Sequence, residues 1–405
     1  MGHEQTGASG EMKNKNLTFK YCVQQFLFWA ANCGVYSFAA TYLLTKGFNA
    51  SQIGRILFVG NTFSFLLQPI IANFADRSRK MIIRKLILML ISVCILCFAA
   101  VRFIAMPIWL FAAVYVVGIT SLDMQNPLLN AENVYYSDRN WTVNYGVARG
   151  MGAAAYVVAS LLMGYIMDDF GADWMPIVSL ALLVLYAAVT AGFPRDESPS
   201  IRKTEGGQAV SLFGFFSKYR WYCVSLFGIL FLALFHVMVE NYLIEILGRF
   251  GGDSSDVGVA LAIATFIETP GMIFFPMIQK KLGSHKVMLT AGVFYCVKAV
   301  LFIFARSVMA IYAAQLLQLV TYTFISPVQM YYAKECTSEA DMIKGQSVIT
   351  AVYALGCALG NLTGGELITA FGVPVMLNIG LAATIAGLAV IVLTVPKALK
   401  AARQI

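Results

Sequence analysis

Charged side chains are scarce in this sequence. Only 12% of its 405 residues are Asp, Glu, Lys or Arg, and 59% are hydrophobic, whereas about a quarter of a soluble domain is charged. This shortage excludes an ordinary soluble domain. Apolar windows of about 20 residues, long enough to cross a bilayer, recur along the whole chain and predict twelve spans. They cover residues 18–44, 50–74, 82–104, 107–135, 145–168, 174–193, 221–247, 257–279, 286–306, 308–333, 345–369 and 373–396.

Catalytic motifs are also missing. The chain has three histidines and no HExxH, GxSxG or P-loop pattern, so we expect neither an enzyme nor direct coupling to ATP, and no metal or cofactor. The N-terminal tail and the central loop are too short for a signalling domain, which argues against a sensor. No basic stretch carries interleaved aromatics, so a nucleic-acid partner is not expected.

The cysteines give no sign of disulfides. Eight are scattered along the chain, and the single CxxC, Cys94 to Cys97, lies in an apolar window. We interpret these residues as small hydrophobic packing groups. The first 17 residues are polar and lack a cleavable signal-peptide pattern. We therefore expect the first span to direct membrane insertion.

Basic residues predict the orientation of the chain. If the N-terminus is cytoplasmic, few basic residues lie in the outside segments, and apart from Arg149 and Lys298 the others lie inside. The outside residues are Lys46, Arg55, Arg102, Arg249 and Arg306. Because cytoplasmic loops carry the excess of Lys and Arg, both termini are predicted to be cytoplasmic, in a multi-pass protein of the inner or plasma membrane.

A polar stretch divides the chain into two halves. Residues 194–220 form the longest polar segment between spans and are expected to be a cytoplasmic linker. Residues 1–193 and 221–405 are then two six-helix bundles. "GYIMDDFG" (164–171) and "GELITAFG" (365–372) end in the same Phe-Gly at corresponding places, which indicates parallel repeats. The predicted architecture is all-α, with two bundles around a central cavity in a monomer.

Small residues recur in the fifth and eleventh spans. Gly356, Gly360 and Gly364 follow one another at four-residue spacing, and the fifth span carries Gly146, Gly150 and Gly152. Glycines at this spacing let membrane helices approach closely. Tight helix packing is the interpretation that we adopt, since a cofactor-binding glycine loop would need a preceding strand.

Three segments carry a family resemblance. They are "ADRSRK" (75–80), "NYGVARGMGAAAY" (144–156) and "IETPGMIFFPMIQKKLGSHKVMLTAGVFYCVK" (267–298). The chain resembles the major facilitator superfamily, and within it the oligosaccharide/proton symporters typified by lactose permease. In "ADRSRK", Ala72 and the missing inner glycine depart from the family signature. The residues of this loop motif are Asp76, Arg77, Arg79 and Lys80.

The resemblance implies roles for individual residues. Arg149 takes the place of an essential sugar-binding arginine, and Tyr156 that of an aromatic that stacks on the sugar. Glu268 and Lys298 take the places of an essential glutamate and a basic residue on the eighth and ninth helices. Two tenth-helix positions that couple protons in the family are Gln318 and Thr321 here, so the coupling machinery departs from the family pattern.

The fourth span offers two partners for Arg149. Glu132 and Arg149 lie at similar depths on either side of a hairpin, but Glu132 sits opposite a polar stripe. The stripe consists of Asp123, Asn126, Asn130 and Asn133. Either Pro127 twists the helix so that Glu132 pairs with Arg149, which we prefer for charge balance, or Asn130 serves and Glu132 faces elsewhere. Arg149 could instead snorkel to the membrane interface. We expect it to grip adjacent hydroxyls or an anionic group through its planar fork.

Ionisable residues of the second half are candidates for proton coupling. Glu268 could bind solute hydroxyls and carry a proton, or form a structural ion pair with Lys298 or Arg149. His236 and Glu240 share a helix face at i and i+4 and could replace the missing relay. A buried histidine that is simply hydrogen-bonded is the alternative.

Neutral polar side chains complete the predicted binding residues. The tenth span carries a stripe of Gln315, Gln318 and Tyr322, and the first carries Asn32 and Tyr36. Such groups suit an uncharged hydroxylated ligand, but they could equally form hydrogen bonds between helices. The predicted function is sugar or oligosaccharide transport with a co-transported proton, by alternating access. A nucleoside:proton symporter is the nearest alternative, and a drug efflux transporter fits less well.

Overall fold

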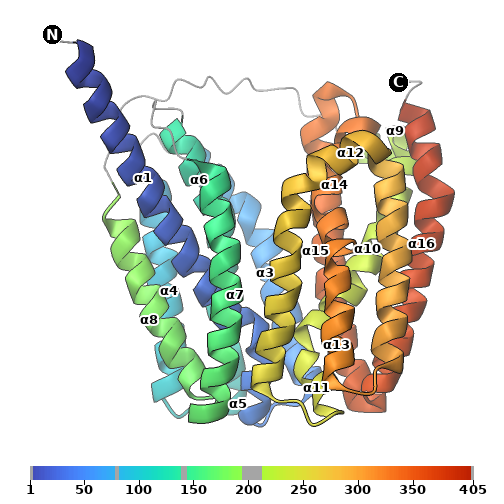
Figure 1. Cartoon of the computed structure of the whole chain (residues 1–405), viewed down its shortest axis with the longest axis horizontal. Helices are drawn as coiled ribbons and strands as arrows, with labels where there is room; N and C mark the ends of the chain where they lie inside the picture. The colour runs from blue at the N-terminus through green and yellow to red at the C-terminus, as the bar shows by residue number, and fades with distance from the viewer. Residues whose placement is uncertain (1–2, 78–81, 138–143, 194–211, 403–405) are drawn as a thin grey trace. The chain divides into compact units, whose positions relative to one another are not determined.

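Helices account for almost the entire described chain. The computed structural model describes residues 3–77, 82–137, 144–193 and 212–402, and no strand occurs among them (Figure 1). The first helices are α1 (His3–Asn32), η1 (Cys33–Ser37), α2 (Ala39–Thr45), α3 (Ala50–Arg77), α4 (Ile82–Phe103), α5 (Ile108–Asp123), α6 (Gln125–Ser137), α7 (Tyr145–Phe170) and α8 (Trp174–Ala191). The later ones are α9 (Leu212–Lys218), α10 (Arg220–Asn241), α11 (Leu243–Gly248), α12 (Ser254–Phe304), α13 (Val308–Gln315), η2 (Leu316–Leu319), α14 (Tyr322–Cys336), η3 (Glu339–Asp341), α15 (Met342–Phe371) and α16 (Val373–Ala402).

These helices coincide with the predicted spans. Within the described residues, nine helices are long and apolar enough to cross a membrane, or ten with the bent pair of the first span. The 51-residue α12 holds the predicted eighth and ninth spans, because Gly283 interrupts its helical geometry at φ 73° and ψ 161°. The second span is the more polar α3. The prediction of an all-α, multi-pass membrane protein is confirmed.

The chain forms two compact units. Unit 1 comprises residues 1–42 and 62–205, and unit 2 comprises residues 43–61 and 206–405. The start of α3 therefore belongs with unit 2, whereas the predicted division placed residues 1–193 in a single bundle. There Arg55 Nη2 lies 2.7 Å from Glu366 Oε1, and the Ser51 N–H donates to Thr369 Oγ1 at 2.8 Å. A Cβ added at Gly365 would collide with the Ala50 carbonyl, so glycine permits this close approach.

Four spans are broken, at corresponding places in the two halves. The first contains a π-helical turn, η1, and bends by 48° before α2. The fourth is interrupted at Met124 between α5 and α6, and the seventh at Tyr242 between α10 and α11. The tenth changes from α13 through the 3₁₀ turn η2 to α14. The first and fourth spans correspond to the seventh and tenth in a parallel repeat, so the breaks agree with the predicted internal symmetry.

The two matching "FG" sequences end their helices in the same way. Gly171 ends α7 at φ 93° and ψ 156°, and Gly372 ends α15 at φ 82° and ψ 169°. This backbone region is open essentially to glycine alone. The repeat noticed in the sequence is thus a shared backbone turn.

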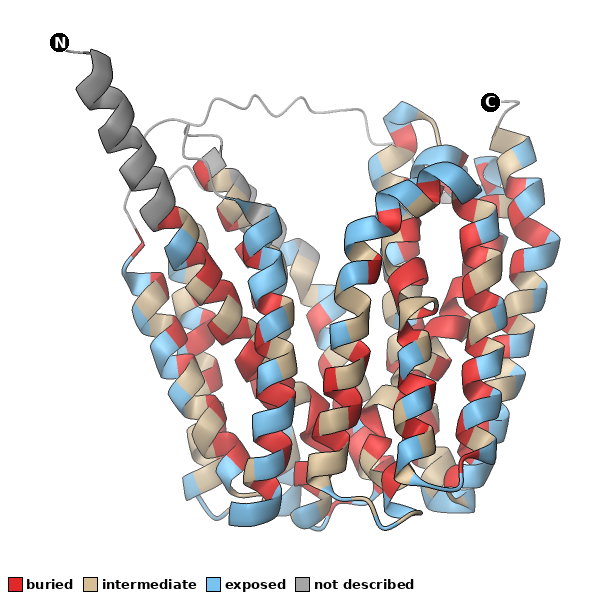
Figure 2. Cartoon of the chain, viewed as in Figure 1, coloured by how far each residue is buried: buried red, intermediate tan, exposed pale blue. Residues whose placement is uncertain are grey.

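The predicted glycine packing holds for the eleventh span. In α15, Gly356 and Gly360 lie against the backbone of α10, where an added Cβ would lie 2.5 Å from the Leu230 or Leu234 carbonyl oxygen. Of the three glycines predicted to pack in the fifth span, only Gly152 is tightly packed, because Gly150 has open space and Gly146 makes ordinary contact. Figure 2 shows buried and exposed residues alternating around the helices of both units, as expected for bundles with apolar outer faces.

Candidate functional site

Arg149 lies over an aromatic ring in unit 1. Its guanidinium carbon is 4.4 Å from the centroid of the Trp29 ring, close enough for a cation–π interaction. Gly152, nearly one turn further along α7, makes room for the indole, since an added Cβ would lie 2.5 Å from Trp29 Cδ1. Arg149 itself is exposed in unit 1. The donors of its planar fork are therefore accessible while its face is supported.

A chain of hydrogen bonds holds the indole in place. Trp29 Nε1 donates to Gln25 Oε1 at 3.1 Å, and Gln25 Nε2 donates to the Tyr21 hydroxyl at 3.0 Å. The Tyr21 hydroxyl donates in turn to the Leu129 carbonyl at 2.8 Å. Trp29 on α1 is thereby linked to α6 through buried polar groups.

Glu132 does not pair with Arg149, so the preferred expectation is wrong. Glu132 is buried and accepts a hydrogen bond from Gln24 Nε2 at 2.9 Å, while the same amide nitrogen lies 3.2 Å from Thr190 Oγ1. The interruption at Met124 does not turn Glu132 toward Arg149. Glu132 faces α1 and α8, as the helical phase of the fourth span indicates.

The polar stripe of the fourth span lies on another face. Asn126 and Asn130 are exposed, whereas Asp123 is half-buried and accepts from Ser64 Oγ at 3.3 Å. Glu132 thus faces away from this stripe, and a role of Asn130 beside Arg149 stays a prediction.

The π-helical turn brings the first and fifth spans together. Ser37 Oγ is hydrogen-bonded to the Tyr156 hydroxyl, and Tyr36 lies in the same turn. The Tyr115 hydroxyl donates to the Val35 carbonyl at 2.7 Å, which satisfies a backbone group inside the turn. Such π turns occur often at functional sites. Tyr36 and Tyr156 are both half-buried.

Unit 2 assembles four predicted residues into one network. Lys298 Nζ donates to Gln318 Oε1 at 2.6 Å, and Gln318 Nε2 donates to Glu268 Oε1 at 2.9 Å. Lys298 Nζ also lies 3.7 Å from Glu240 Oε1, to which Gln315 Nε2 donates at 3.5 Å. We call Glu240, Glu268, Lys298 and Gln318 the central network. Gln318 thus links Glu268 to Lys298 through its amide.

The break in the tenth span positions Gln318. Gln318 lies in the 3₁₀ turn η2, and its backbone carbonyl accepts from Thr323 Oγ1 at 3.0 Å. Thr321 Oγ1 donates to the Leu317 carbonyl at 2.9 Å. The Thr323 hydroxyl thus pairs with the Gln318 carbonyl at the break, whereas the Leu317 carbonyl also accepts from the Val320 and Thr321 N–H groups. Broken membrane helices of this kind form the ligand sites of many transporters.

His236 lies beside the central network and stacks on an aromatic ring. Its ring is 4.8 Å from that of Tyr322, with an interplanar angle of 17°. Its Nδ1 atom is buried and has no hydrogen-bond partner among the described residues. The predicted hydrogen-bonded relay between His236 and Glu240 is not formed in this conformation.

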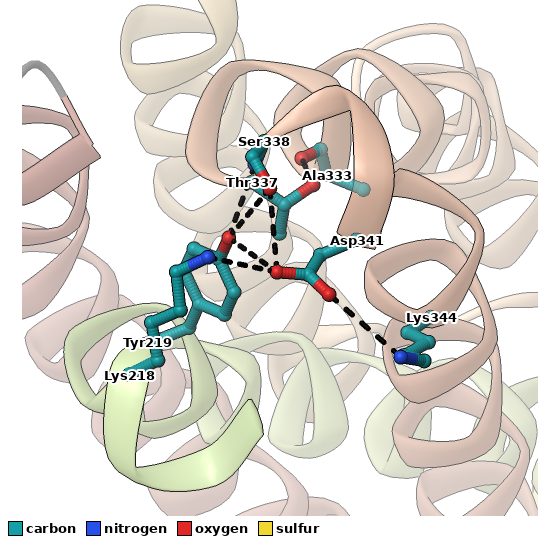
Figure 3. A network of polar contacts seen from close by, with 7 residues as sticks. All are labelled: Lys218, Tyr219, Ala333, Thr337, Ser338, Asp341 and Lys344. Atoms are coloured by element: carbon teal, nitrogen blue, oxygen red, sulfur yellow. Dashed lines mark hydrogen bonds and ion pairs between the residues drawn. The ribbon is translucent and has the colours of Figure 1, made fainter. Parts of the chain in front are cut away.

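A second polar network lies at the end of unit 2 where α10 begins (Figure 3). Lys218 Nζ and the Tyr219 hydroxyl each donate to Asp341 Oδ2 at 2.9 Å. Lys344 Nζ lies 3.8 Å from Asp341 Oδ1, and Ser338 Oγ donates to Oδ2 at 3.3 Å. The Tyr219 side chain and the Asp341 carboxylate raise the pKa of the Lys218 ammonium, which keeps it charged. This network fastens α9 to η3.

Two candidate residues of the site were not predicted from the sequence, and two predicted residues lie outside the described part of the chain. Trp29 and Gln25, spaced i and i+4 in the first span, could have been found as an aromatic beside an intramembrane amide. Of the loop motif, Asp76 and Arg77 close α3, whereas Arg79 and Lys80 lie outside the described residues.

A family comparison identifies the class of protein. The model of the MFS_1 like family matches residues 18–379. The chain belongs to the major facilitator superfamily. It is therefore a membrane transporter with a small-molecule substrate, and not an enzyme. No curated protein matches the sequence significantly.

Solved structures of the superfamily share the fold. The nucleoside transporter NupG superposes with a TM-score of 0.78 at 14% identity, covering 93% of this chain and 98% of that one. A bacterial homologue of the human lysosomal transporter Spinster, in an inward-facing and unoccupied conformation, gives a TM-score of 0.69 at 14% identity, covering 96% and 97%. This agreement supports the superfamily fold across the whole chain.

Proposed function

We propose that this superfamily member is a secondary active transporter that moves a neutral, hydroxylated solute together with a proton by alternating access. Sugars and oligosaccharides are the proposed solutes. The observation that carries the proposal is the accessible guanidinium of Arg149, whose flat face lies on Trp29. Its donors can grip two adjacent hydroxyls, while the neighbouring aromatic groups can contact the apolar face of a sugar ring.

The central network supports proton coupling. Glu240 and Glu268 share a single ammonium group, Lys298, and all three lie in the interior of unit 2. Two half-buried carboxylates beside one buried cation carry one net negative charge, so a proton on one carboxylate makes the group neutral. Solute binding that rearranges Gln318 would change which carboxylate holds that proton. We propose Glu268 and Glu240 as the proton carriers, with Lys298 as their common counter-ion.

A nucleoside is the second candidate solute. A nucleoside also presents adjacent hydroxyls, on its ribose, and its base could stack near Trp29. The fold similarity to a solved nucleoside transporter gives this alternative its support. The two candidates differ in the planar base, which a sugar lacks.

One experiment on purified protein tests the proposal. Melting is recorded with galactosides, glucosides, other disaccharides and nucleosides, for the wild type, Arg149→Lys and Arg149→Ala. A solute at about 100 times its dissociation constant stabilises the folded protein by about 2.7 kcal/mol. We expect a sugar to raise the melting temperature of the wild type, with little effect in Arg149→Lys, which keeps the charge and loses the fork, and none in Arg149→Ala.

The same solute is then added to proteoliposomes containing a pH indicator. Symport predicts that an inward solute gradient acidifies the lumen, and that Glu268→Gln abolishes this acidification. If nucleosides alone raise the melting temperature, the proposed solute becomes a nucleoside, the second candidate. A solute that stabilises Arg149→Ala as well as the wild type would exclude the role proposed for Arg149.

A further inference from the structure

Glu245 is a buried carboxylate outside the central network. It lies on α11, beyond the break at Tyr242 and at the opposite end of the seventh span from Arg220. Both of its carboxylate oxygens are buried and have no hydrogen-bond partner within the described part of the chain. Among the described residues no other carboxylate has both oxygens in this situation. An ionised carboxylate left this way would cost several kcal/mol, and a bound proton would remove that cost.

The neighbouring charged groups are engaged elsewhere. α11 packs against α10 and α12, and the Tyr242 hydroxyl donates to the Asn361 carbonyl of α15. The titratable groups on these elements nearest this end of unit 2 have their own partners. They are Glu240 with Lys298 and Gln315, Asp256 with Tyr312 and the Asp253 backbone, and Glu366 with Arg55.

Arg249 offers Glu245 an alternative partner. It follows Glu245 by four residues, and α11 and its C-cap have right-handed helical geometry. A glutamate four residues before an arginine is well placed for a helical ion pair. In this structure, however, the Arg249 guanidinium carbon lies 5.2 Å from the Phe250 ring centroid. The two residues thus have the spacing of a helical ion pair, but the pair is not formed in this structure.

We propose that Glu245 is a second proton-binding site of the transporter, switched by Arg249. In the state described here Glu245 holds the proton. When this end of unit 2 opens to water, the proton passes to a water molecule, and the carboxylate turns to pair with Arg249. The role of Glu245 in transport rests on the proton coupling proposed above. The presence of a bound proton on Glu245 does not depend on that coupling.

Infrared spectroscopy tests the bound proton without any solute. A protonated carboxyl group has a C=O stretching band that is separate from the bands of an ionised carboxylate. The difference spectrum of wild type minus Glu245→Gln should show one such carboxyl band, which the variant lacks. Glu366→Gln is the matched control, because the Glu366 side chain is 44% exposed and is paired with Arg55. Its spectrum should keep the band. Glu245→Leu, which also needs no partner, provides a second variant if Glu245→Gln folds poorly.

Titration of the same band tests the switch. Arg249→Gln removes the partner of the ionised form, so the band should persist to higher pH than in the wild type. If the band survives in both Glu245 variants, Glu245 is ionised and the inference is overturned. A titration unchanged by Arg249→Gln overturns the switch. Neither result depends on finding the solute, so failure here is distinguishable from failure of the proposed function.

Discussion

At the scale of the residue, Trp29 gives Arg149 a partner without charge. A carboxylate at this position would compete with a neutral solute for the donors of the guanidinium. An indole instead contacts only its flat face, at 4.4 Å from the ring centroid, and leaves the edges of the fork open. The pairing of Glu132 with Gln24 keeps the nearest predicted acid away from this fork.

Removing the indole should weaken solute binding. A cation–π contact contributes about 0.5–2 kcal/mol, so Trp29→Leu should raise the dissociation constant roughly 2- to 30-fold. Trp29→Phe keeps a ring face and should recover much of the loss. Both are measured by the solute dependence of melting. Equal losses in the two variants would mean that the ring face does not matter.

Gly152 provides an independent check on the same contact. Gly152→Ala places a methyl group 2.5 Å from Trp29 Cδ1 and should displace the ring, weakening solute binding in the same assay. Gly150→Ala is the control, because nothing lies within 4 Å of its added Cβ. Both variants keep Trp29 and Arg149, so a difference between them reports the position of the ring.

At the scale of the element, α15 depends on glycine for its contact with α10. An added Cβ at Gly360 would lie 2.5 Å from the Leu234 carbonyl oxygen, and a helix backbone cannot turn aside as a side chain can. Overpacking of this kind costs about 1–3 kcal/mol. We therefore expect Gly360→Ala to lower the melting temperature of the detergent-purified protein. Gly150→Ala should leave it unchanged, and equal melting of the two variants would contradict the packing account.

Much of the architecture was predictable because bilayer thickness dictates helix length. The twelve apolar windows follow from that constraint, and the glycine spacing of α15 follows from close helix packing. The helix breaks could not be read from the sequence, since no proline lies in η1 or η2 and tertiary hydrogen bonds stabilise these turns. Helical phase alone placed Glu132 correctly, whereas the preference for charge balance did not.

The central network was only partly predictable. Intramembrane charge identified Glu268, Lys298 and Glu240, because such residues are costly unless they are paired. The bridging position of Gln318 depends on the 3₁₀ turn, which brings its amide between Glu268 and Lys298 of α12. The link from Trp29 to α6 was equally hidden, since it runs through the hydrogen bond from the Tyr21 hydroxyl to the Leu129 carbonyl.

At the scale of the whole molecule, the basic residues predict which face is cytoplasmic. Arg306 and Lys281 are exposed residues of unit 2 on opposite predicted faces, and all eight native cysteines are buried or half-buried. We expect Arg306→Cys to react with a membrane-impermeant maleimide in intact cells. Lys281→Cys should react only after permeabilisation. The reverse pattern would invert the topology.

The shared turn at Gly171 and Gly372 constrains how the fifth helix of either half can end. Only a few letters match before the two glycines, yet both backbones take a conformation that is open essentially to glycine alone. The turn therefore depends on the backbone and not on the side chains around it. Any side chain at either position would have to reshape the connection to the next helix, whatever solute the transporter carries.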